Sequence, residues 1–363
     1  MDDFSAYFGE VDDPRAGNAR HNLLELIFVA LAAVLCGAED CTDMAEFARA
    51  KLGLLRQVVD LEHGPPNHDT FSRVFRLLDP EPFEAAFARF TAAFAGALEG
   101  VVAIDGKALR GAYERGRKAT PLHLVNVWAA EKRLVIGQRL ALGRNEVAGV
   151  LEVLTLLRLD GCIVTADALH CRPDTAQAIL ATGADYALAI KENRPKLLAS
   201  AKALIARGEQ ADVATIRSGP AHDRTEIRHA IVVPAEALDF PGIAAVGQVE
   251  TCRRNAGRDE PPVKRWFLLS RPLTAKRLIE VARAHWTIEN QLHWVLDVSL
   301  SEDACQIYRG NAATNLATMR HFGLNMLRAE KRKMSIRRKQ RQALMNEAYL
   351  DAVLEAGMSV VIK

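Results

Sequence analysis

The sequence has no long hydrophobic run, no closely spaced cysteine pair and no basic start. Its richest apolar stretch, residues 23–36, is shorter than the ~18 residues that cross a bilayer, and Glu25 interrupts it. The six cysteines include no Cys-x-x-Cys pair, which favours a reduced protein over a disulfide framework. The first residues, Met1-Asp2-Asp3, lack the positive charge of a secretory signal. We therefore expect a cytoplasmic protein without a membrane segment.

The composition also excludes wholesale disorder. Of the 363 residues, 49% are hydrophobic and 25% are charged, which is the balance of a globular protein. This length allows two or three domains of roughly 100–200 residues each. We find no internal repeat and no low-complexity segment.

The charged residues are unevenly distributed, although 47 lysines and arginines nearly balance 45 acidic residues. Residues 1–13 carry five acids and no base, whereas residues 328–341, here called the basic run, carry eight bases and the single acid Glu330. Such a run predicts a polyanionic partner, usually nucleic acid, and hence association with the nucleoid. A solvated helix face would carry the same charges, so the run needs support from other features.

The first 98 residues predict a helical domain. An aromatic stripe at helical spacing indicates core packing, and it consists of Phe83, Phe87, Phe90 and Phe94. Residues 67–70 form a turn before a helix that carries Arg73 and Arg76, and this helix could face DNA or solvent. We expect the domain to fold alone and to contribute to DNA recognition.

From residue 101 the pattern changes from helices to strands. Three strands are followed by helix, strand, helix and strand, an order that predicts a mixed sheet with helices on its faces. Residues 211–270 predict an inserted antiparallel patch, and residues 274–296 predict one long helix. The expected strands of the sheet are 101–104, 122–130, 134–142, 162–165 and 186–190, and its helices are 145–159 and 172–182.

Two of these strands each deliver an aspartate. Residues 101–104 lead to Asp105, and residues 162–165 end two positions before Asp167. If the strands lie side by side and parallel, both carboxylates reach the sheet edge where open α/β sheets place ligands. Two such anions repel each other unless a cation lies between them, and oxygen ligands suit Mg²⁺ or Mn²⁺. Either aspartate alone could equally form a turn or cap a helix.

A third acid lies on the expected long helix. His285, Glu289 and His293 follow one another at i, i+4 spacing, so one helix face carries an acid between two imidazoles. The set could bind zinc, but it lacks the His-Glu-x-x-His order and a nearby thiol pair. A solvated helix face is the alternative. Apolar residues cover much of the rest of this helix, and an acid in such surroundings usually has a partner or a ligand.

Three segments resemble the motifs of the ISAs1-type transposases, which include the H-repeat-associated proteins. Residues 105–111 resemble the first-aspartate motif, residues 165–170 the second, and residues 285–297 with 302–304 the glutamate motif. The resemblance covers nearly the whole chain. Shorter similarities lie at residues 13–15, 20–21, 45–47, 191–193, 222–226 and 335–339.

The resemblance implies a DDE transposase of an ISAs1-like insertion sequence with an RNase H-like core. Asp105, Asp167 and Glu289 fall on the family's three acidic positions, as catalytic residues and as ligands of two Mg²⁺ (or Mn²⁺) ions. Two ions roughly 3.5–4 Å apart activate the attacking group and stabilise the leaving oxygen of a phosphodiester. We expect Asp105 to bridge the ions, with Asp167 on one and Glu289 on the other.

The wider IS4-like group carries a Tyr-x2-Arg-x3-Glu-x6-Lys signature on the glutamate helix. Here Ala282, His285 and Leu296 occupy the Tyr, Arg and Lys positions, so the DNA contacts of that signature are not carried over.

DNA is the expected partner, at the element ends and at the target, and we expect a homo-oligomer on it. A catalytically idle DNA-binding relative and a metal-dependent nuclease or phosphatase are the alternatives, because the same metal cage serves several reactions. The basic run favours a long polyanion over a small phosphoester. The predicted phosphate contacts are Lys107, Arg110, Lys191, Arg337, Arg338 and Lys339.

The sequence therefore predicts an α/β protein in three parts. Residues 1–98 form an N-terminal helical DNA-binding domain. Residues 99–327 form an RNase H-like catalytic domain, a mixed sheet flanked by helices with a β-rich insertion at about 211–270. Residues 328–363 form a basic tail and helix.

Overall fold

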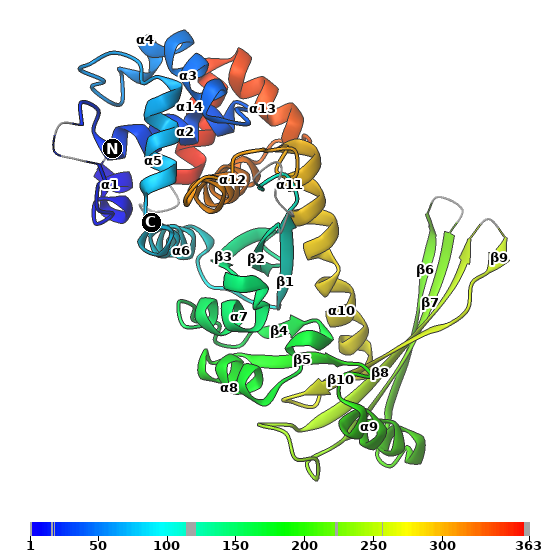
Figure 1. Cartoon of the computed structure of the whole chain (residues 1–363). Coiled ribbons are helices and arrows are strands. Elements are labelled where there is room, and N and C mark those ends of the chain that lie inside the picture. Colours follow the sequence, from blue (N-terminus) through cyan, green and yellow to red (C-terminus); the bar gives the residue numbers. More distant parts are fainter. Residues whose placement is uncertain are drawn as a thin grey trace.

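The computed structural model describes residues 2–15, 17, 19–113, 121–221, 224–255 and 257–358. His222 and Asp223 of the motif at 222–226 lie outside the described residues. A helical body, a central sheet with helices on both faces, and a long β-ribbon to one side make up the molecule (Figure 1). Among the described residues, no helix is long and apolar enough to cross a membrane.

The first half of the sheet has the strand order β3-β2-β1-β4-β5. β1, β2 and β3 are antiparallel neighbours, whereas β4 and β5 run parallel to β1. This is the strand arrangement of an RNase H-like fold, and it confirms the predicted mixed sheet. The bounds are β1 Val101–Leu109, β2 Leu122–Ala129, β3 Leu134–Leu140, β4 Ile163–Ala166 and β5 Asp185–Ile190.

Helices cover both faces of this sheet because its strands are apolar on both sides. α7 (Glu146–Leu154) and α8 (Pro173–Ala181) pack on one face, and α10 (Ala275–His285) packs on the other (Figure 1). Val101 and Leu278 belong to the core under α10, whereas Val102 belongs to the larger core of the opposite face. Adjacent strand residues point to opposite faces, so both helix layers are anchored by the same strands.

The inserted strands continue the sheet and do not form a separate patch. β10 (Val263–Leu269) pairs with β5, and β8, β7 and β6 follow outward, all antiparallel. α9 (Pro195–Arg207) leads into the insertion and packs on it, and the outer strands extend beyond it as a ribbon (Figure 1). The remaining bounds are β6 Asp212–Ala221, β7 Arg224–Pro234, β8 Ala245–Asn255 and β9 Arg258–Asp259.

Both ends of the chain build the helical body. α12 (Ala312–Ala329) is buried along most of its length and packs against α2, α5, α6 and α14. A Cβ on Gly323 of α12 would lie 2.8 Å from Val34 Cγ1, so glycine permits this close approach. The other helices are α1 Asp2–Phe8, α2 Leu23–Leu35, α3 Cys41–Ala50, α4 Leu52–Leu55, α5 His68–Leu77, α6 Pro80–Ala95, α13 Ile336–Met345 and α14 Glu347–Met358.

Three members of the predicted aromatic stripe, Phe83, Phe87 and Phe90, lie in the core of this body. The ring of Phe90 stacks on Phe322 of α12 with centroids 4.5 Å apart, and Phe87 lies 5.6 Å from the same ring. The N-terminal helices therefore share their core with α12. This packing argues against a domain of residues 1–98 that folds alone.

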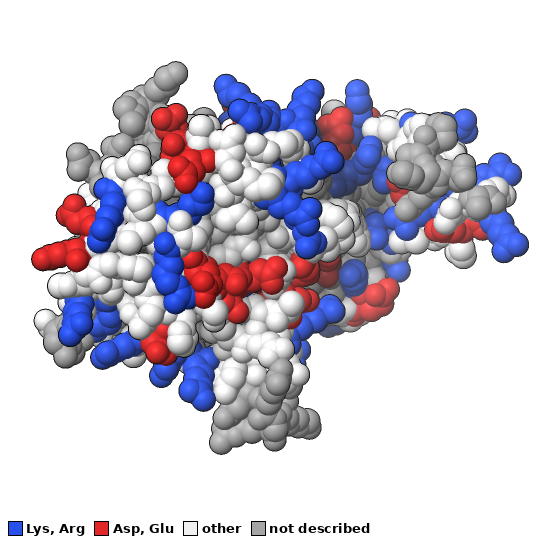
Figure 2. All heavy atoms as spheres, turned by 90° about the horizontal axis from the view of Figure 1, so that it is seen from above, with Lys and Arg blue, Asp and Glu red and all other residues white. Residues whose placement is uncertain are grey.

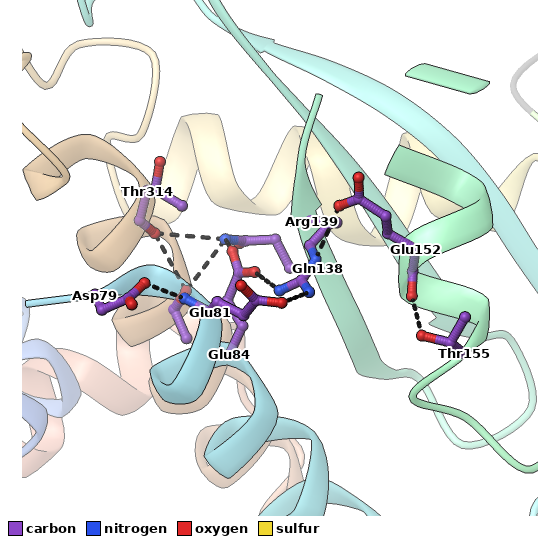
Figure 3. A network of polar contacts seen from close by, with 9 residues as sticks. Asp79, Glu81, Glu84, Gln138, Arg139, Glu152, Thr155 and Thr314 are labelled. Atoms are coloured by element: carbon purple, nitrogen blue, oxygen red, sulfur yellow. Dashed lines mark hydrogen bonds and ion pairs between the residues drawn. The ribbon is translucent and has the colours of Figure 1, made fainter. Parts of the chain in front are cut away.

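A buried polar network joins the helical body to the edge strand of the sheet (Figure 3). Gln138 Nε2 donates to Glu84 Oε1 at 3.0 Å, and Arg139 Nη1 donates to Glu84 Oε2 at 3.0 Å. Arg139 also reaches Glu81 at 2.9 Å and Glu152 at 3.3 Å, so it links α6, β3 and α7. Burial raises the pKa of Glu84 to about 7 despite the neighbouring guanidinium.

Candidate active site

The two strand aspartates lie beside each other, as predicted. β1 and β4 are parallel, and their last paired residues are Ile104 and Ala166. Asp105 follows Ile104 and Asp167 follows Ala166, so the two aspartates are neighbours across the two strands. The charge of Asp167 helps to raise the pKa of Asp105. Asp105 lies within its strand and not at its end, because β1 continues to Leu109 against β2 after β4 has stopped.

Glu289 lies close to Asp105. One carboxylate oxygen of Asp105, one of Glu289 and one ring nitrogen of His293 all lie within 4.8 Å of one another. Glu289 is exposed to solvent, and its charge is the largest neighbouring cause of the raised pKa of Asp105. Acids from three separated segments thus meet at one sheet edge.

The predicted helix over residues 274–296 is present, but it is not one regular α-helix. α10 ends at His285, a π-helical turn spans Ile288–His293, and α11 (Trp294–Ser299) follows. Thr287 lies at the break, where its hydroxyl donates to Ala284 O at 2.6 Å and accepts from Trp128 Nε1 at 2.9 Å. A threonine bound back to its own helix competes with the regular ladder, and π-turns are frequent at functional sites.

The charge around Asp105 favours a cation. Burial, followed by the charges of Glu289, Asp167 and Glu146, raises the pKa of Asp105 to about 7, although the Gly106 amide, which donates to Oδ1 at 2.9 Å, opposes them. Clustered carboxylates of this kind are stabilised by a divalent ion, and an oxygen-rich set suits Mg²⁺ or Mn²⁺. The donor set therefore fits the predicted metal.

The two histidines of the motif face different acids. His285 Nδ1 lies 3.0 Å from Thr165 Oγ1 on the side of Asp167, and burial lowers its pKa to about 4. His293 Nδ1 lies 3.8 Å from Asp105 Oδ2, and burial lowers its pKa to about 3. Both imidazoles are neutral at physiological pH.

Sequence reasoning missed a fourth acid, Glu146, at the start of α7. Its carboxylate lies 3.0 Å from His123 Nδ1 and 4.0 Å from His170 Nε2. A Cβ on Gly106 would lie 2.5 Å from this carboxylate, which explains the glycine after Asp105. Nothing in the sequence around Glu146 indicates that the first turn of α7 faces Asp105.

The predicted phosphate contacts fall into two groups. Lys107 and Lys339 are buried: Lys107 lies among three carboxylates, and Lys339 Nζ donates to Leu327 O at 2.7 Å. Such positions argue against direct contact with DNA, because both ammonium groups already have protein partners. The exposed group is Arg110, Lys191, Arg337 and Arg338, in which Lys191 Nζ lies 3.4 Å from Asp167.

A polar groove of about 910 Å³ lies beside Glu289, between α10 and the inserted strands. Trp286, Thr287, Asn290 and Gln291, which flank Glu289 in the chain, form one wall. The lining includes one acid, Glu226, and four arginines: Arg228, Arg253, Arg265 and Arg283. We call this feature the arginine groove. Its excess positive charge suits a polyanion.

Charges of opposite sign are separated on the face that Figure 2 shows. Seen from above, a band of acidic side chains crosses the middle of the molecule, with lysines and arginines on both sides (Figure 2).

Two family models match the chain. One, described as DDE_Tnp_1-associated, matches residues 5–91, and the other, described as Transposase DDE domain, matches residues 96–326. The chain is 34% identical to "Putative protein YbfL" of Escherichia coli K12, over 96% of each chain. It is 35% identical to "H repeat-associated putative transposase YhhI" of the same strain, over 93% of this chain and 94% of that protein.

Among solved structures, the piggyBac transposase synaptic complex with hairpin DNA matches 97% of this chain and 77% of that chain. The identity is 12% and the TM-score 0.44.

An RNase H-like sheet with two strand aspartates and a helix glutamate at one edge has the arrangement of a DDE domain. The chain belongs to the DDE transposase family. The matches confirm the resemblance to the H-repeat-associated proteins.

Proposed function

We propose that this protein is the transposase of an ISAs1-like insertion sequence, which cleaves the element ends and joins them to target DNA. The meeting of Asp105, Asp167 and Glu289 at one sheet edge carries the proposal. Divalent ions held there would activate the attacking hydroxyl or water and stabilise the leaving oxygen.

The three acids differ in ways that suit separate roles. Asp105 is the most enclosed and has both other acids as charged neighbours, so it is the ligand that would be shared by two Mg²⁺ or Mn²⁺ ions. Asp167 and Glu289 are exposed, so each would hold one ion where DNA can approach.

The arginine groove is the proposed path of the DNA next to the cleaved bond. Arg283 is exposed, and Arg265 lies over the ring of Trp286 at 4.9 Å, so both place positive charge near Glu289. Backbone contacts of this kind fix position without reading sequence. Arg337 and Arg338, which are exposed on α13, would hold DNA farther away, and a homo-oligomer would bring two element ends together.

The test is cleavage and joining of DNA that contains the sequences flanking this reading frame. We expect full-length protein with Mg²⁺ or Mn²⁺ to nick at the element boundary and to form joined products. Asp105→Asn, Asp167→Asn and Glu289→Gln should each lose both products while remaining folded and bound to DNA. Cleavage without joining would identify a nuclease, and wild-type cleavage by any amide variant would remove that residue from the site.

A further inference from the structure

We propose that His293 is a ligand of the divalent ion held by Asp105 and Glu289, so that this ion site has a nitrogen donor and prefers Mn²⁺ to Mg²⁺. The inference rests on the proposed function, because it concerns the same metal site. It adds a histidine to the ligand set of the three acids Asp105, Asp167 and Glu289.

The π-turn places His293 where a ligand is needed. Glu289 and His293 lie four residues apart on this turn, and both present an atom to Asp105 within the 4.8 Å cluster. The imidazole is 8% exposed, so it is fixed in the protein and not free in solvent. Oxygen and nitrogen ligands 2.0–2.2 Å from one ion are themselves about 3–4 Å apart. The 3.8 Å between His293 Nδ1 and Asp105 Oδ2 falls in this range.

The same distance argues against a simple hydrogen bond. An imidazole N–H that donates to a carboxylate lies about 2.7–3.2 Å from the oxygen. At 3.8 Å the two atoms face each other without that bond. A cation between them would stabilise both.

Asn126 on β2 supplies the supporting contact. Its amide nitrogen lies 3.4 Å from His293 Nε2, and its amide oxygen is buried without a hydrogen-bond partner among the described residues. The two ends of an amide have the same shape, so turning it by 180° lets the amide oxygen accept a hydrogen bond from Nε2–H. That contact fixes the tautomer whose Nδ1 lone pair points to Asp105, the usual arrangement behind a metal-bound histidine.

The nitrogen donor makes the two ion positions unequal. Imidazole is a good ligand for transition metals, whereas Mg²⁺ takes oxygen almost alone. The position shared by Asp105 and Asp167 would have carboxylate ligands only. His285 is not part of the cluster found among the described residues, and its Nδ1 lies 3.0 Å from Thr165 Oγ1.

Pulsed electron paramagnetic resonance of Mn²⁺ bound to the full-length protein tests the inference directly. A coordinated imidazole modulates the Mn²⁺ echo through its nitrogen nucleus, and an all-oxygen site does not. We expect this modulation in the wild-type protein and in the matched control His285→Gln. His293→Gln should lose it and bind Mn²⁺ about tenfold or more weakly, with a smaller change for Mg²⁺.

A second variant guards against a folding defect. His293→Glu keeps a ligand but replaces nitrogen by oxygen, so it should bind Mn²⁺ without the modulation. Bound Mn²⁺ with no nitrogen signal in the wild type, or a signal that persists in His293→Gln, overturns the inference and leaves the proposed function standing. Absence of Mn²⁺ binding, with no difference between the wild type and Asp105→Asn, overturns both.

Discussion

Lys107 Nζ lies 2.6 Å from Asp297 Oδ1, an ion pair that ties the strand of Asp105 to the helix that follows Glu289. Two further carboxylates surround the same ammonium, Glu302 at 3.7 Å and Asp303 at 3.6 Å. Lys107 is thus the common cation of an acidic cluster. Because Lys107 lies two residues after Asp105, its ion pair with Asp297 holds the strand of Asp105 against the helix that follows Glu289.

Removing this cation should destabilise the fold strongly. Lys107→Met leaves the surrounding carboxylates without their counter-charge, and breaking a buried ion pair from one side costs about 3–5 kcal/mol. Denaturant unfolding measures the loss. Arg110→Gln is the matched control, because Arg110 reaches Asp303 from an exposed position and should cost under ~1 kcal/mol. Equal effects of the two variants would contradict the role given to Lys107.

The two glycines of the first motif should respond differently to alanine. A Cβ on Gly111 would lie 2.4 Å from Cys305 O and 2.6 Å from Asp303 O, both backbone atoms that cannot turn aside. A Cβ on Gly106 meets the end of the Glu146 side chain, which can rotate. We expect Gly111→Ala to lower the free energy of unfolding by about 1–3 kcal/mol and Gly106→Ala by clearly less. Thermal unfolding of both variants decides the order, and a larger loss for Gly106→Ala would contradict it.

Stability should fall as Glu84 ionises. Its pKa is about 7 in the folded protein and near 4.5 when exposed, so the folded state holds the proton more tightly. The penalty is absent below about pH 4.5, grows with rising pH and is complete above about pH 7, by up to ~3 kcal/mol. Relative to Glu84→Gln, the wild type should therefore lose stability across this window.

Unfolding free energies at a series of pH values measure this difference. Glu152→Gln removes the exposed carboxylate from the same Arg139 and serves as the control. A wild type that gains stability relative to Glu84→Gln as the pH rises would show that Arg139 outweighs burial.

The salt dependence of DNA binding should show whether the arginine groove and the arginines of α13 contact phosphates. On duplex DNA the slope of log K against log salt is about −0.9 per phosphate neutralised. Arg265→Gln with Arg283→Gln should flatten it by up to about 2 units, and Arg337→Gln with Arg338→Gln by a similar amount. Preference for specific over random DNA should change little, because phosphates carry no sequence.

Arg158→Gln controls for net charge, since Arg158 is exposed outside both surfaces. Lys339 is left unchanged, because its buried ammonium holds α13 to the end of α12 and its loss would disturb folding. A slope unchanged in the groove variant would remove the arginine groove from the DNA path.

The sequence contained enough information for the two strand acids and for the general sheet. Strands of apolar residues and helices at their expected spacing determine the mixed sheet, and parallel pairing of two such strands brings Asp105 beside Asp167. The mixed sheet and the pairing of the two aspartates could be predicted because both depend on local sequence patterns.

Other features depend on contacts between distant segments. At the break after His285, Thr287 accepts a hydrogen bond from Trp128, a residue 159 positions earlier in the chain. Lys107 reads as a free base in a motif, yet its partners lie about 190 residues later. The position of Glu146 likewise follows from how α7 packs on β2, which no local pattern encodes.

The position of α12 in the chain determines when the core of the helical body can form during synthesis. Residues 312–329 fill the centre of a bundle whose other helices include residues 2–95, so the apolar faces of the earliest helices stay open until almost the whole chain has been synthesised. During that interval Phe8 and Phe90 lack the Phe322 ring that later covers them. A gene copy truncated before residue 312 would therefore yield a chain that exposes its own core and becomes a substrate for chaperones and proteases.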